Sequence, residues 1–221
     1  MDIIVHPPNL LRFFFKNFLW KINPGEGRKV LYITIDDGPI PELTPGTLEM
    51  LAEFGAKATF FCVGENVLRY PDIYQQILNG GHSVGNHTFN HLKGTRSKVK
   101  DYVQNVHLAD QYIRTKLFRP PYGLIRKPQA RIINKEKKVV LWDVLSEDYN
   151  KRLSPQECWQ NVLRNASSGS ILLFHDNIKA EPRQRYALRR TLEYYSELGF
   201  AFDPIPDGVN NFLNNSEKMI L

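Results

Sequence analysis

Residues 30–39 read VLYITIDDGP, an apolar run that leads directly into two adjacent carboxylates, Asp36 and Asp37. The apolar run is typical of a buried strand, and an unpaired carboxylate desolvated at its end would cost several kcal/mol. Neighbouring side chains of an extended segment point to opposite sides, so the two aspartates can serve one site from different directions. The stretch therefore predicts a buried strand that ends at a site where the carboxylates hold a partner.

Short apolar runs alternate with longer helical patterns from Val30 onward, which is the signature of βαβ units around a parallel sheet. We expect seven strands, at residues 30–35, 58–63, 82–86, 116–118, 139–143, 170–174 and 200–205. The fold class is α/β, and we predict a distorted (β/α) barrel with about seven parallel strands. The spacing alone also allows an open doubly wound sheet.

Local signals place helices between these strands. Thr44 followed by Pro45 predicts a helix N-cap and a first helical residue. Ser154 and Glu157 form a predicted capping box at the start of a later helix. Further helices are expected from residue 71 to the glycines at 80 and 81, and at residues 98–115 and 185–198.

Polar residues collect at the predicted carboxyl ends of the strands, where (β/α) barrels carry their chemistry. These residues are Asp36, Asp37, Asn86, His87, Arg119, Asp143 and His175. Polar residues scattered through a core are not expected to cluster in this way. We therefore predict the active site at this end of the sheet.

The segment NHTFNH at residues 86–91 contains two histidines spaced four apart, His87 and His91. In a helical turn both imidazoles would project from one face, about 5–6 Å apart at Cβ, which suits two nitrogens that meet one metal ion. By itself the spacing favours a structural histidine pair. Together with a strand-end carboxylate, two imidazoles make a three-ligand site with open positions, which is a catalytic arrangement. One aspartate of the pair is then a ligand, and the other is available as a general base.

Five segments, in this order, resemble the motifs of the polysaccharide deacetylase family, also called the NodB homology domain or carbohydrate esterase family 4. They are TIDDGP (34–39), NHTFNH (86–91), RPPYG (119–123), WDVLSEDY (142–149) and LLFHD (172–176). Each motif alone is modest, but five in order are specific. The resemblance extends over roughly residues 30–202 and implies a NodB-like barrel.

The resemblance also implies a role for each residue that matches a motif. Asp36 resembles the catalytic base, and Asp37, His87 and His91 resemble the metal ligands. The other implied roles are general acid for His175, orientation and charging of that histidine for Asp148, support of the base for Arg119, oxyanion binding through the backbone N–H and sugar contact for Tyr122, and reception of the acetyl methyl group for Leu173. Trp142, within the fourth motif, is interpreted as a core or pocket-wall residue, with a substrate-binding platform for the sugar as the alternative.

The implied reaction is hydrolysis of the acetyl amide of an amino-sugar glycan, such as chitin oligomers or peptidoglycan. Water activated by the metal would lose a proton to Asp36, and His175 would protonate the departing amine. One divalent ion is implied. Nitrogen and oxygen ligands suit Zn²⁺, and they also accept Co²⁺, Ni²⁺, Mn²⁺ or Fe²⁺.

Three residues depart from the usual motifs of the family. Ile35 replaces a Phe, Leu145 stands where the fourth motif often has an Asp, and Tyr149 stands where Trp is common. These changes leave the implied metal and acid–base residues intact. They affect the shape of the pocket and therefore the identity of the sugar.

Other function classes were weighed against hydrolysis. A carbohydrate-binding protein of the same fold with little or no deacetylase activity is the alternative, although such a protein would be expected to lack at least one of the implied catalytic and metal-binding residues, namely Asp36, Asp37, His87, His91 and His175. The chain has a net charge of +6, but its 29 Lys and Arg are scattered among 23 Asp and Glu, so we expect no nucleic-acid partner. A non-haem iron oxygenase shares the ligand set but needs neither the second aspartate nor the acid histidine.

The N-terminal stretch LLRFFFKNFLW, residues 10–20, is apolar but interrupted by Arg12 and Lys16. It is shorter than the roughly 20 residues of a spanning helix, and no small-residue cleavage site follows it, so no signal peptide is evident. We predict that residues 1–29 pack on a catalytic domain of residues 30–206, followed by a tail of residues 207–221. The expected protein is a cytoplasmic or peripheral membrane monomer, with membrane contact through residues 10–20 as the less favoured option.

Overall fold

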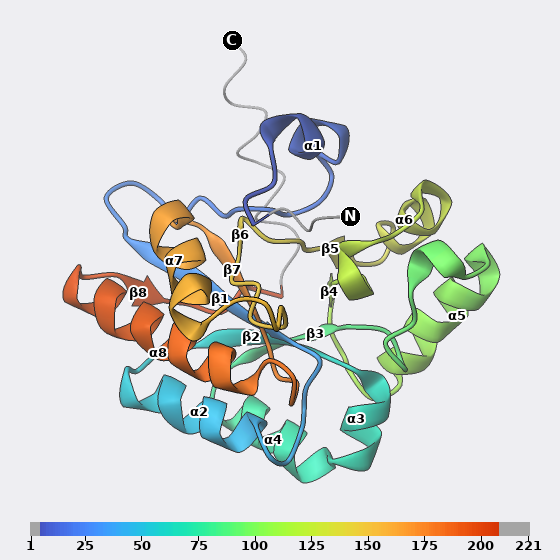
Figure 1. The fold of residues 1–221 in the computed structure, drawn as a ribbon. Helices are drawn as coiled ribbons and strands as arrows, with labels where there is room; N and C mark the ends of the chain where they lie inside the picture. The colour runs from blue at the N-terminus through green and yellow to red at the C-terminus, as the bar shows by residue number, and fades with distance from the viewer. Residues whose placement is uncertain (1–4, 208–221) are drawn as a thin grey trace.

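The computed structural model describes residues 5–207, and its centre is a curled sheet (Figure 1). The strands are β1 (Val30–Asp36), β2 (Ala58–Cys62), β3 (Ser83–Asn86), β4 (Leu117–Phe118), β5 (Lys138–Val139), β6 (Val144–Leu145), β7 (Ile171–His175) and β8 (Ala201–Phe202). Seven of them lie in the order β5-β4-β3-β2-β1-β7-β6, and β8 pairs with β1. All these pairs are parallel, so the predicted distorted (β/α) barrel with about seven parallel strands is confirmed.

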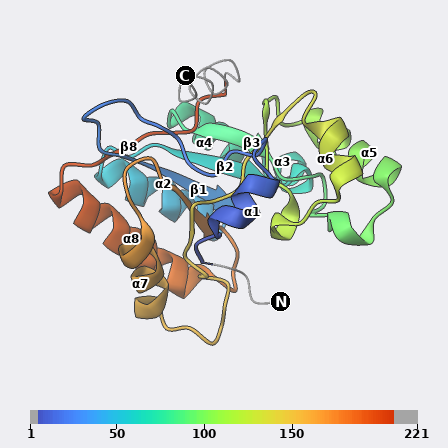
Figure 2. The ribbon, with the colours of Figure 1, turned by 90° about the horizontal axis from the view of Figure 1, so that it is seen from above.

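Helices surround this sheet in an arc that runs from α7 through α8, α2, α4, α3 and α5 to α6, with α1 apart from it (Figure 1). Seen from above, α7, α8 and α2 lie on one side of the sheet and α5 and α6 on the other (Figure 2). The helices are α1 (Asn9–Phe14), α2 (Thr44–Glu53), α3 (Gly64–Arg69), α4 (Pro71–Asn79), α5 (Val99–Asp110), α6 (Lys127–Ile133), α7 (Pro155–Asn165) and α8 (Glu181–Glu197), with short 3₁₀ turns at Gly94–Arg96 and Pro121–Gly123.

The first strand is buried along its whole length, as the apolar run VLYITI predicts. Ile33 and Ile35 join a core cluster with Leu51 of α2 and Leu188 of α8. Tyr32, which points to the opposite face, joins a second cluster with residues of other strands and of the N-terminal segment. Burial on both faces is the ordinary state of a parallel sheet and explains why the strand lacks polar alternation.

The strand predicted at residues 139–143 is wrong, because the chain divides there into β5 and β6 at opposite ends of the sheet. After β5 the backbone crosses the gap between the sheet ends, where Leu141 donates to the carbonyl of Leu19 at 2.8 Å and Asp143 donates to that of Ile171 at 2.9 Å. Leu19 in turn donates to the carbonyl of Val139 at 2.8 Å. The N-terminal segment thus fills the opening that a closed barrel would not have.

One of the two predicted helix N-caps is confirmed. The Ser154 hydroxyl accepts from the Glu157 backbone amide, and the Glu157 carboxylate accepts from that of Ser154, which makes the capping box. Thr44 is not an N-cap, since α2 begins at Thr44 and its hydroxyl donates to Asp176 at 2.7 Å. The partner of this hydroxyl is a buried carboxylate distant in the sequence, and a local sequence pattern cannot predict such a contact.

The segment before β1 is partly buried and partly exposed. Leu10, Phe13 and Phe14 on α1 are 68%, 71% and 66% exposed, whereas Phe18 and Trp20 are buried in the core. No helix among residues 5–207 has the length and apolar composition needed to cross a membrane. Apart from residue 207, the predicted tail at 207–221 lies outside the described residues.

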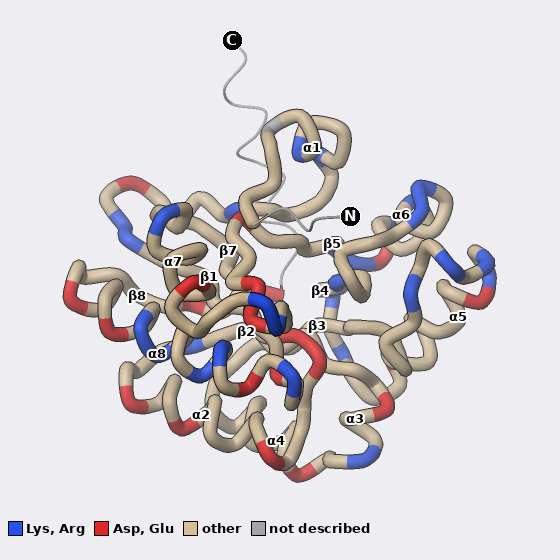
Figure 3. Tube along the Cα trace, in the orientation of Figure 1, with Lys and Arg blue, Asp and Glu red and all other residues tan. Residues whose placement is uncertain are grey.

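Charged residues of both signs are mixed along the outer helices (Figure 3). Acidic residues also occur in the middle of the view of Figure 3, near the ends of β1 and β2, where Asp36 and Asp37 follow the buried run. The basic surplus of the sequence is therefore spread over the outer surface of the described part of the chain.

Candidate active site

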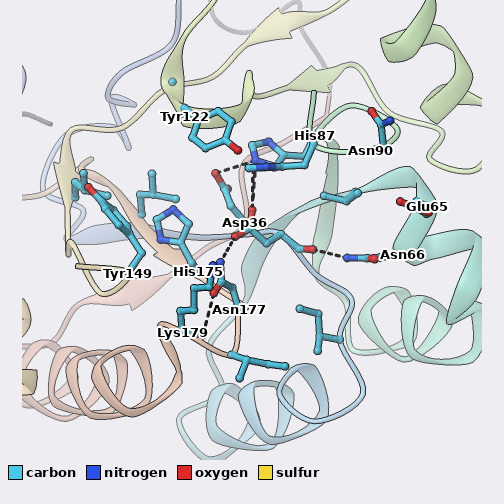
Figure 4. Close-up of a pocket in the computed structure, with 18 of the residues that line it drawn as sticks. Asp36, Glu65, Asn66, His87, Asn90, Tyr122, Tyr149, His175, Asn177 and Lys179 are labelled. Carbon is cyan, nitrogen blue, oxygen red and sulfur yellow. Dashed lines mark hydrogen bonds and ion pairs between the residues drawn. The ribbon is translucent and has the colours of Figure 1, made fainter. Parts of the chain in front are cut away.

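A cavity of about 690 Å³ opens where the strands end (Figure 4). The sequence-predicted residues that line it are Asp36, Asp37, His87, His91, Tyr122, Trp142, Leu173 and His175. Arg119 and Asp148 are fully buried behind its wall, each bonded to a lining residue. Parallel strands bring these distant segments together because their carboxyl ends meet at one edge of the sheet. Asn86 and Asp143, which the sequence analysis also placed at the strand ends, do not line the cavity. The prediction for Asp143 is wrong, because its carboxylate accepts from Ser170, just before the start of β7 and so at the other end of the sheet.

Three of these side chains form a candidate metal centre. Oδ1 of Asp37 lies 3.3 Å from Nε2 of His91 and 3.6 Å from Nε2 of His87. One ligand atom from each residue lies within 4.8 Å of the other two. This same Oδ1 is buried without a hydrogen-bond partner among the described residues, which is the state expected of an oxygen that binds a cation. The donor set therefore fits one divalent ion with open positions.

The protonation of His87 suits a ligand. Its Nδ1 lies 2.8 Å from the backbone carbonyl of Arg119, so this nitrogen carries the hydrogen and Nε2 presents a lone pair toward Asp37. Burial lowers the pKa of His87 to about 4, which keeps the ring neutral at pH 7. Burial alone would raise the pKa of Asp37, but the close approach of His91 and the charges of the nearby histidines lower it well below its usual range.

The local geometry of these ligands differs from two expectations. Residues 87–91 form no helical turn, because Thr88 and His91 have left-handed φ angles of 65° and 57°. Side-chain bonds hold this loop instead, with Asn86 accepting from the amide of Thr88 at 2.8 Å. Asp37 is not extended either, since its φ is 82°. Both predictions of backbone form are wrong, although the side chains still converge.

Asp36 has different partners from Asp37. Arg119 donates to its Oδ1 at 2.7 Å, and its Oδ2 lies 3.8 Å from Nε2 of His87. The guanidinium is fully buried and also donates to the hydroxyl of Thr34 and to two backbone carbonyls. One oxygen of Asp36 is thus fixed by Arg119, and the other faces the candidate metal centre.

His175 forms a dyad with Asp148. One carboxylate oxygen of Asp148 lies 2.7 Å from Nδ1 of His175, and the other accepts from the His175 backbone amide at 2.8 Å. Burial alone would lower the pKa of this histidine, but Asp148, with smaller contributions from Asp37 and Asp36, raises it to about 9. The ring is therefore a cation at pH 7 and can supply a proton.

The cavity walls hold the remaining predicted residues. Tyr122 is half exposed, with a φ of 63° and its ring 4.7 Å from that of His91. Gly123 is required beside it, because a Cβ there would lie 2.5 Å from the ring of Trp142. Leu173 is buried on the cavity floor, and Tyr149, one of the motif departures, places its ring 5.2 Å from that of His175.

Sequence reasoning missed two asparagines that hold Asp37. Asn177 donates to its Oδ2 at 3.0 Å, and Asn66 donates to its backbone carbonyl at 2.8 Å. Asn177 follows β7 by two residues, so the rule that placed polar strand-end residues at the site could have included it. Asn66 lies inside α3, and no local pattern indicates its contact.

Comparison with known proteins gives matches that cover most of the chain. Residues 23–139 match the family described as polysaccharide deacetylase. A peptidoglycan-N-acetylglucosamine deacetylase of Bacillus cereus is 32% identical over 191 residues, which cover 83% of this chain and 88% of the relative. A chitooligosaccharide deacetylase of Azorhizobium caulinodans is 31% identical over 200 residues, 82% of this chain and 95% of the relative.

Solved structures agree with these sequence matches. The crystal structure of the peptidoglycan N-acetylglucosamine deacetylase Bc1960 superposes with a TM-score of 0.77 at 27% identity. The superposition covers 88% of this chain and 94% of that one. The likeness therefore extends over most of both chains.

Proposed function

Because the chain belongs to the polysaccharide deacetylase family, we propose that it is a metal-dependent hydrolase that removes N-acetyl groups from an amino-sugar glycan. The relatives that deacetylate peptidoglycan and chitooligosaccharides support this substrate class. One observation supports this proposal most directly. A single cavity is lined by three residues that could bind a metal ion, Asp37, His87 and His91, together with Asp36 and the protonated His175.

Asp37, His87 and His91 would hold one divalent ion, with Zn²⁺ best suited to two imidazoles and a carboxylate. When bound, the ion supplies Lewis acidity, which makes a water easier to deprotonate and an acetyl carbonyl easier to attack. Asn177 and Asn66 keep Asp37 in place through its second oxygen and its backbone.

Asp36 is the proposed general base. Arg119 fixes one of its oxygens, so the other is free to take the proton of the attacking water on the side of His87. The guanidinium also pairs with the carboxylate of Asp36 in a buried place, where an unpaired carboxylate would be costly.

His175 is the proposed general acid. Asp148 binds its Nδ1, which leaves Nε2 as the nitrogen that donates a proton to the departing amine. The backbone N–H of Tyr122 would bind the oxygen that gains charge during attack. Leu173 and Trp142 would hold the acetyl group and one face of the sugar, consistent with their place in the cavity wall.

Acetate release from a panel of acetylated glycans tests this proposal. The purified protein is treated with a chelator and then assayed on chitin oligomers and on peptidoglycan, with Zn²⁺, Co²⁺, Ni²⁺, Mn²⁺ or Fe²⁺ added back. We expect release from at least one glycan that depends on an added ion. Glycan binding without acetate release under every condition would favour the carbohydrate-binding alternative.

A further inference from the structure

An ion pair outside the cavity joins the last residue of α5 to the residue before β5. Nζ of Lys137 lies 2.7 Å from Oδ1 of Asp110, and the two side chains are 7% and 28% exposed. The same ammonium donates to the backbone carbonyl of Thr115 at 2.7 Å. Neither charged residue lines the cavity, so the pair has no direct part in the proposed reaction.

Asn86 connects this ion pair to the candidate metal ligands. Its side-chain Nδ2 donates to Oδ1 of Asp110 at 2.7 Å and to the carbonyl of Val106 at 2.9 Å. Both partners are acceptors, so they fix the orientation of the amide, because its oxygen could not approach them. Oδ1 of Asn86 is thereby free to accept from the backbone amide of Thr88 at 2.8 Å. His87 lies between these two residues in the chain, so both of its neighbours are held.

Thr88 depends on such contacts, because its left-handed φ of 65° is uncommon for a β-branched residue. A backbone of this kind persists only where the surrounding structure fixes it. Besides the amide bond to Asn86, the hydroxyl of Thr88 accepts from the amide of Leu92 at 3.0 Å. Leu92 directly follows His91, which also has a left-handed φ, of 57°. These bonds connect the loop that carries both histidine ligands to the Asn86 side chain.

We propose that the Lys137–Asp110 ion pair positions the metal-ligand loop by orienting Asn86. The inference rests on the proposed function, since it requires that His87 and His91 bind a divalent ion. Lys137 holds the Asp110 carboxylate, and this carboxylate holds Nδ2 of Asn86. Loss of the pair should therefore weaken ion binding, because the two imidazoles would be less well preorganised.

The test measures Zn²⁺ affinity in variants of this pair. The double exchange Asp110→Ala with Lys137→Met removes the acceptor of Asn86, yet it leaves no buried ammonium unpaired and keeps the net charge. Asp110→Asn is the conservative variant, since it retains an oxygen that can accept from Asn86. Glu136→Gln is the matched control, because Glu136 precedes Lys137 and makes an exposed ion pair with His107 of the same helix at 3.1 Å.

The Kd for Zn²⁺ of each chelated protein is measured by competition with a chromogenic chelator, and urea unfolding of the metal-free proteins is followed beside it. We expect the double variant to bind Zn²⁺ about tenfold more weakly than the wild type, the usual size for loss of a group that orients metal ligands. Asp110→Asn should retain most of the affinity, and Glu136→Gln should bind as the wild type does. An unchanged Kd in the folded double variant, or an equal loss in either of the other two, would overturn the inference.

Lys137→Met alone decides the question if the double variant does not fold, because it leaves the Asp110 carboxylate partly exposed and bonded to Asn86. We expect a several-fold loss of Zn²⁺ affinity. Removal of a positive charge would by itself strengthen the binding of a cation, so a loss reports positioning. Unchanged or tighter binding would overturn the inference.

Acetate release by the same wild-type preparation separates this inference from the proposed function. A wild type that binds Zn²⁺ but releases no acetate from the glycan panel would contradict the proposed function, and the comparison of Kd values would still decide the role of the ion pair. A wild type that binds none of the added ions would overturn the inference, because the loop would then hold no ion.

Discussion

Asp36 and Asp37 are neighbours in sequence and both lie within 4 Å of His87, yet their other contacts differ. Asp36 is tied to the buried Arg119, whereas Asp37 keeps a buried oxygen that accepts no hydrogen bond from the described residues. An oxygen without a partner suits a cation, and an oxygen next to a fixed guanidinium suits a base with a set direction. These contacts support the roles that the motif order predicted.

Exchange of either aspartate for asparagine should separate the two roles. Asp36→Asn should keep the bound ion, because its ligands are untouched, but should lower kcat by about 10²–10⁴, the usual contribution of a positioned base. Asp37→Asn should lose the ion and the activity together. Elemental analysis and acetate release are measured on the same preparations of both variants. If Asp36→Asn lost the metal and Asp37→Asn kept it, the assignment of base and ligand would be reversed.

The pH dependence of the reaction should depend on His175. Its pKa of about 9 means that the acid form is present at neutral pH and is lost as pH rises through about 9. Since Asp37 and Asp36 contribute to the raised pKa, a cation at Asp37 would offset part of it, and the basic limb of kcat/KM should lie at or below about pH 9. Asp148→Asn should move this limb to lower pH, because burial alone lowers the pKa. A basic limb at the same pH in the wild type and in Asp148→Asn would contradict the role of the His175–Asp148 dyad.

The same raised pKa should affect stability. The protonated His175 stabilises the fold fully below the unfolded histidine pKa of about 6.5, and this contribution declines as pH rises through about 9. His175→Gln should therefore have a flatter dependence of unfolding free energy on pH than the metal-free wild type between about pH 6.5 and 9. Urea unfolding at several pH values measures the unfolding free energy of the two proteins. The same pH dependence in both would contradict the prediction.

Among the elements, the N-terminal segment lies against both ends of the open sheet. Arg12 of α1 donates to buried Asp143 at 2.6 Å, and Ser170, just before β7, donates to the same carboxylate at 2.5 Å. Leu19 forms a parallel β-bridge with Val140, and Lys21 forms an antiparallel β-bridge with Ser170. The segment therefore joins the two ends of the open barrel by backbone and ionic contacts.

Removal of Arg12 should destabilise the protein more than removal of a surface arginine. Arg12→Ala leaves a buried carboxylate with fewer donors and should cost about 2–3 kcal/mol. Arg28→Ala is the control, because its pair with Asp203 has side chains 59% and 40% exposed and should cost less than about 1 kcal/mol. The urea denaturation midpoints of the two variants are compared with that of the wild type. Equal shifts would mean that the contact between Arg12 and Asp143 contributes no more to stability than a surface ion pair.

Some elements could be predicted from the sequence and others could not. The buried strand VLYITI and the Ser154 capping box depend on local patterns, so both were predictable. The division of residues 139–143 depends on how the sheet ends are placed, which no local pattern contains. The loop at residues 86–91 depends on side-chain bonds from Asn86 and Thr88 that replace a helical turn.

At the scale of the molecule, the order of five motifs predicted the family, and the comparisons confirm it. The order does not contain the distances between side chains, so the bond from Asn66 to the carbonyl of Asp37 and the bond from Arg183 to the carbonyl of Asp148 were visible only in the fold. The sheet also brings together residues far apart in the sequence, as in the bond between Asn177 and Asp37, which are 140 residues apart.

The exposed face of α1 raises the question of membrane contact for the whole protein. We predict weak or no co-sedimentation with anionic vesicles, because Arg12 is paired with Asp143 and the apolar residues Phe18–Trp20 are buried in the core. The control is a double variant, Phe13→Ser with Phe14→Ser, which removes two exposed rings without touching the core. Strong vesicle binding by the wild type that disappears in this variant would contradict the prediction.

The most direct test of the central claim is a metal titration of the chelated protein, with acetate release followed on an acetylated glycan that the panel identifies as a substrate. The account predicts that activity is absent without the ion, rises with added Zn²⁺ or Co²⁺ and saturates near one ion per chain, and that Asp37→Ala stays inactive through the same titration. Full acetate release by the ion-free protein, or a titration in which Asp37→Ala behaves as the wild type, would contradict it.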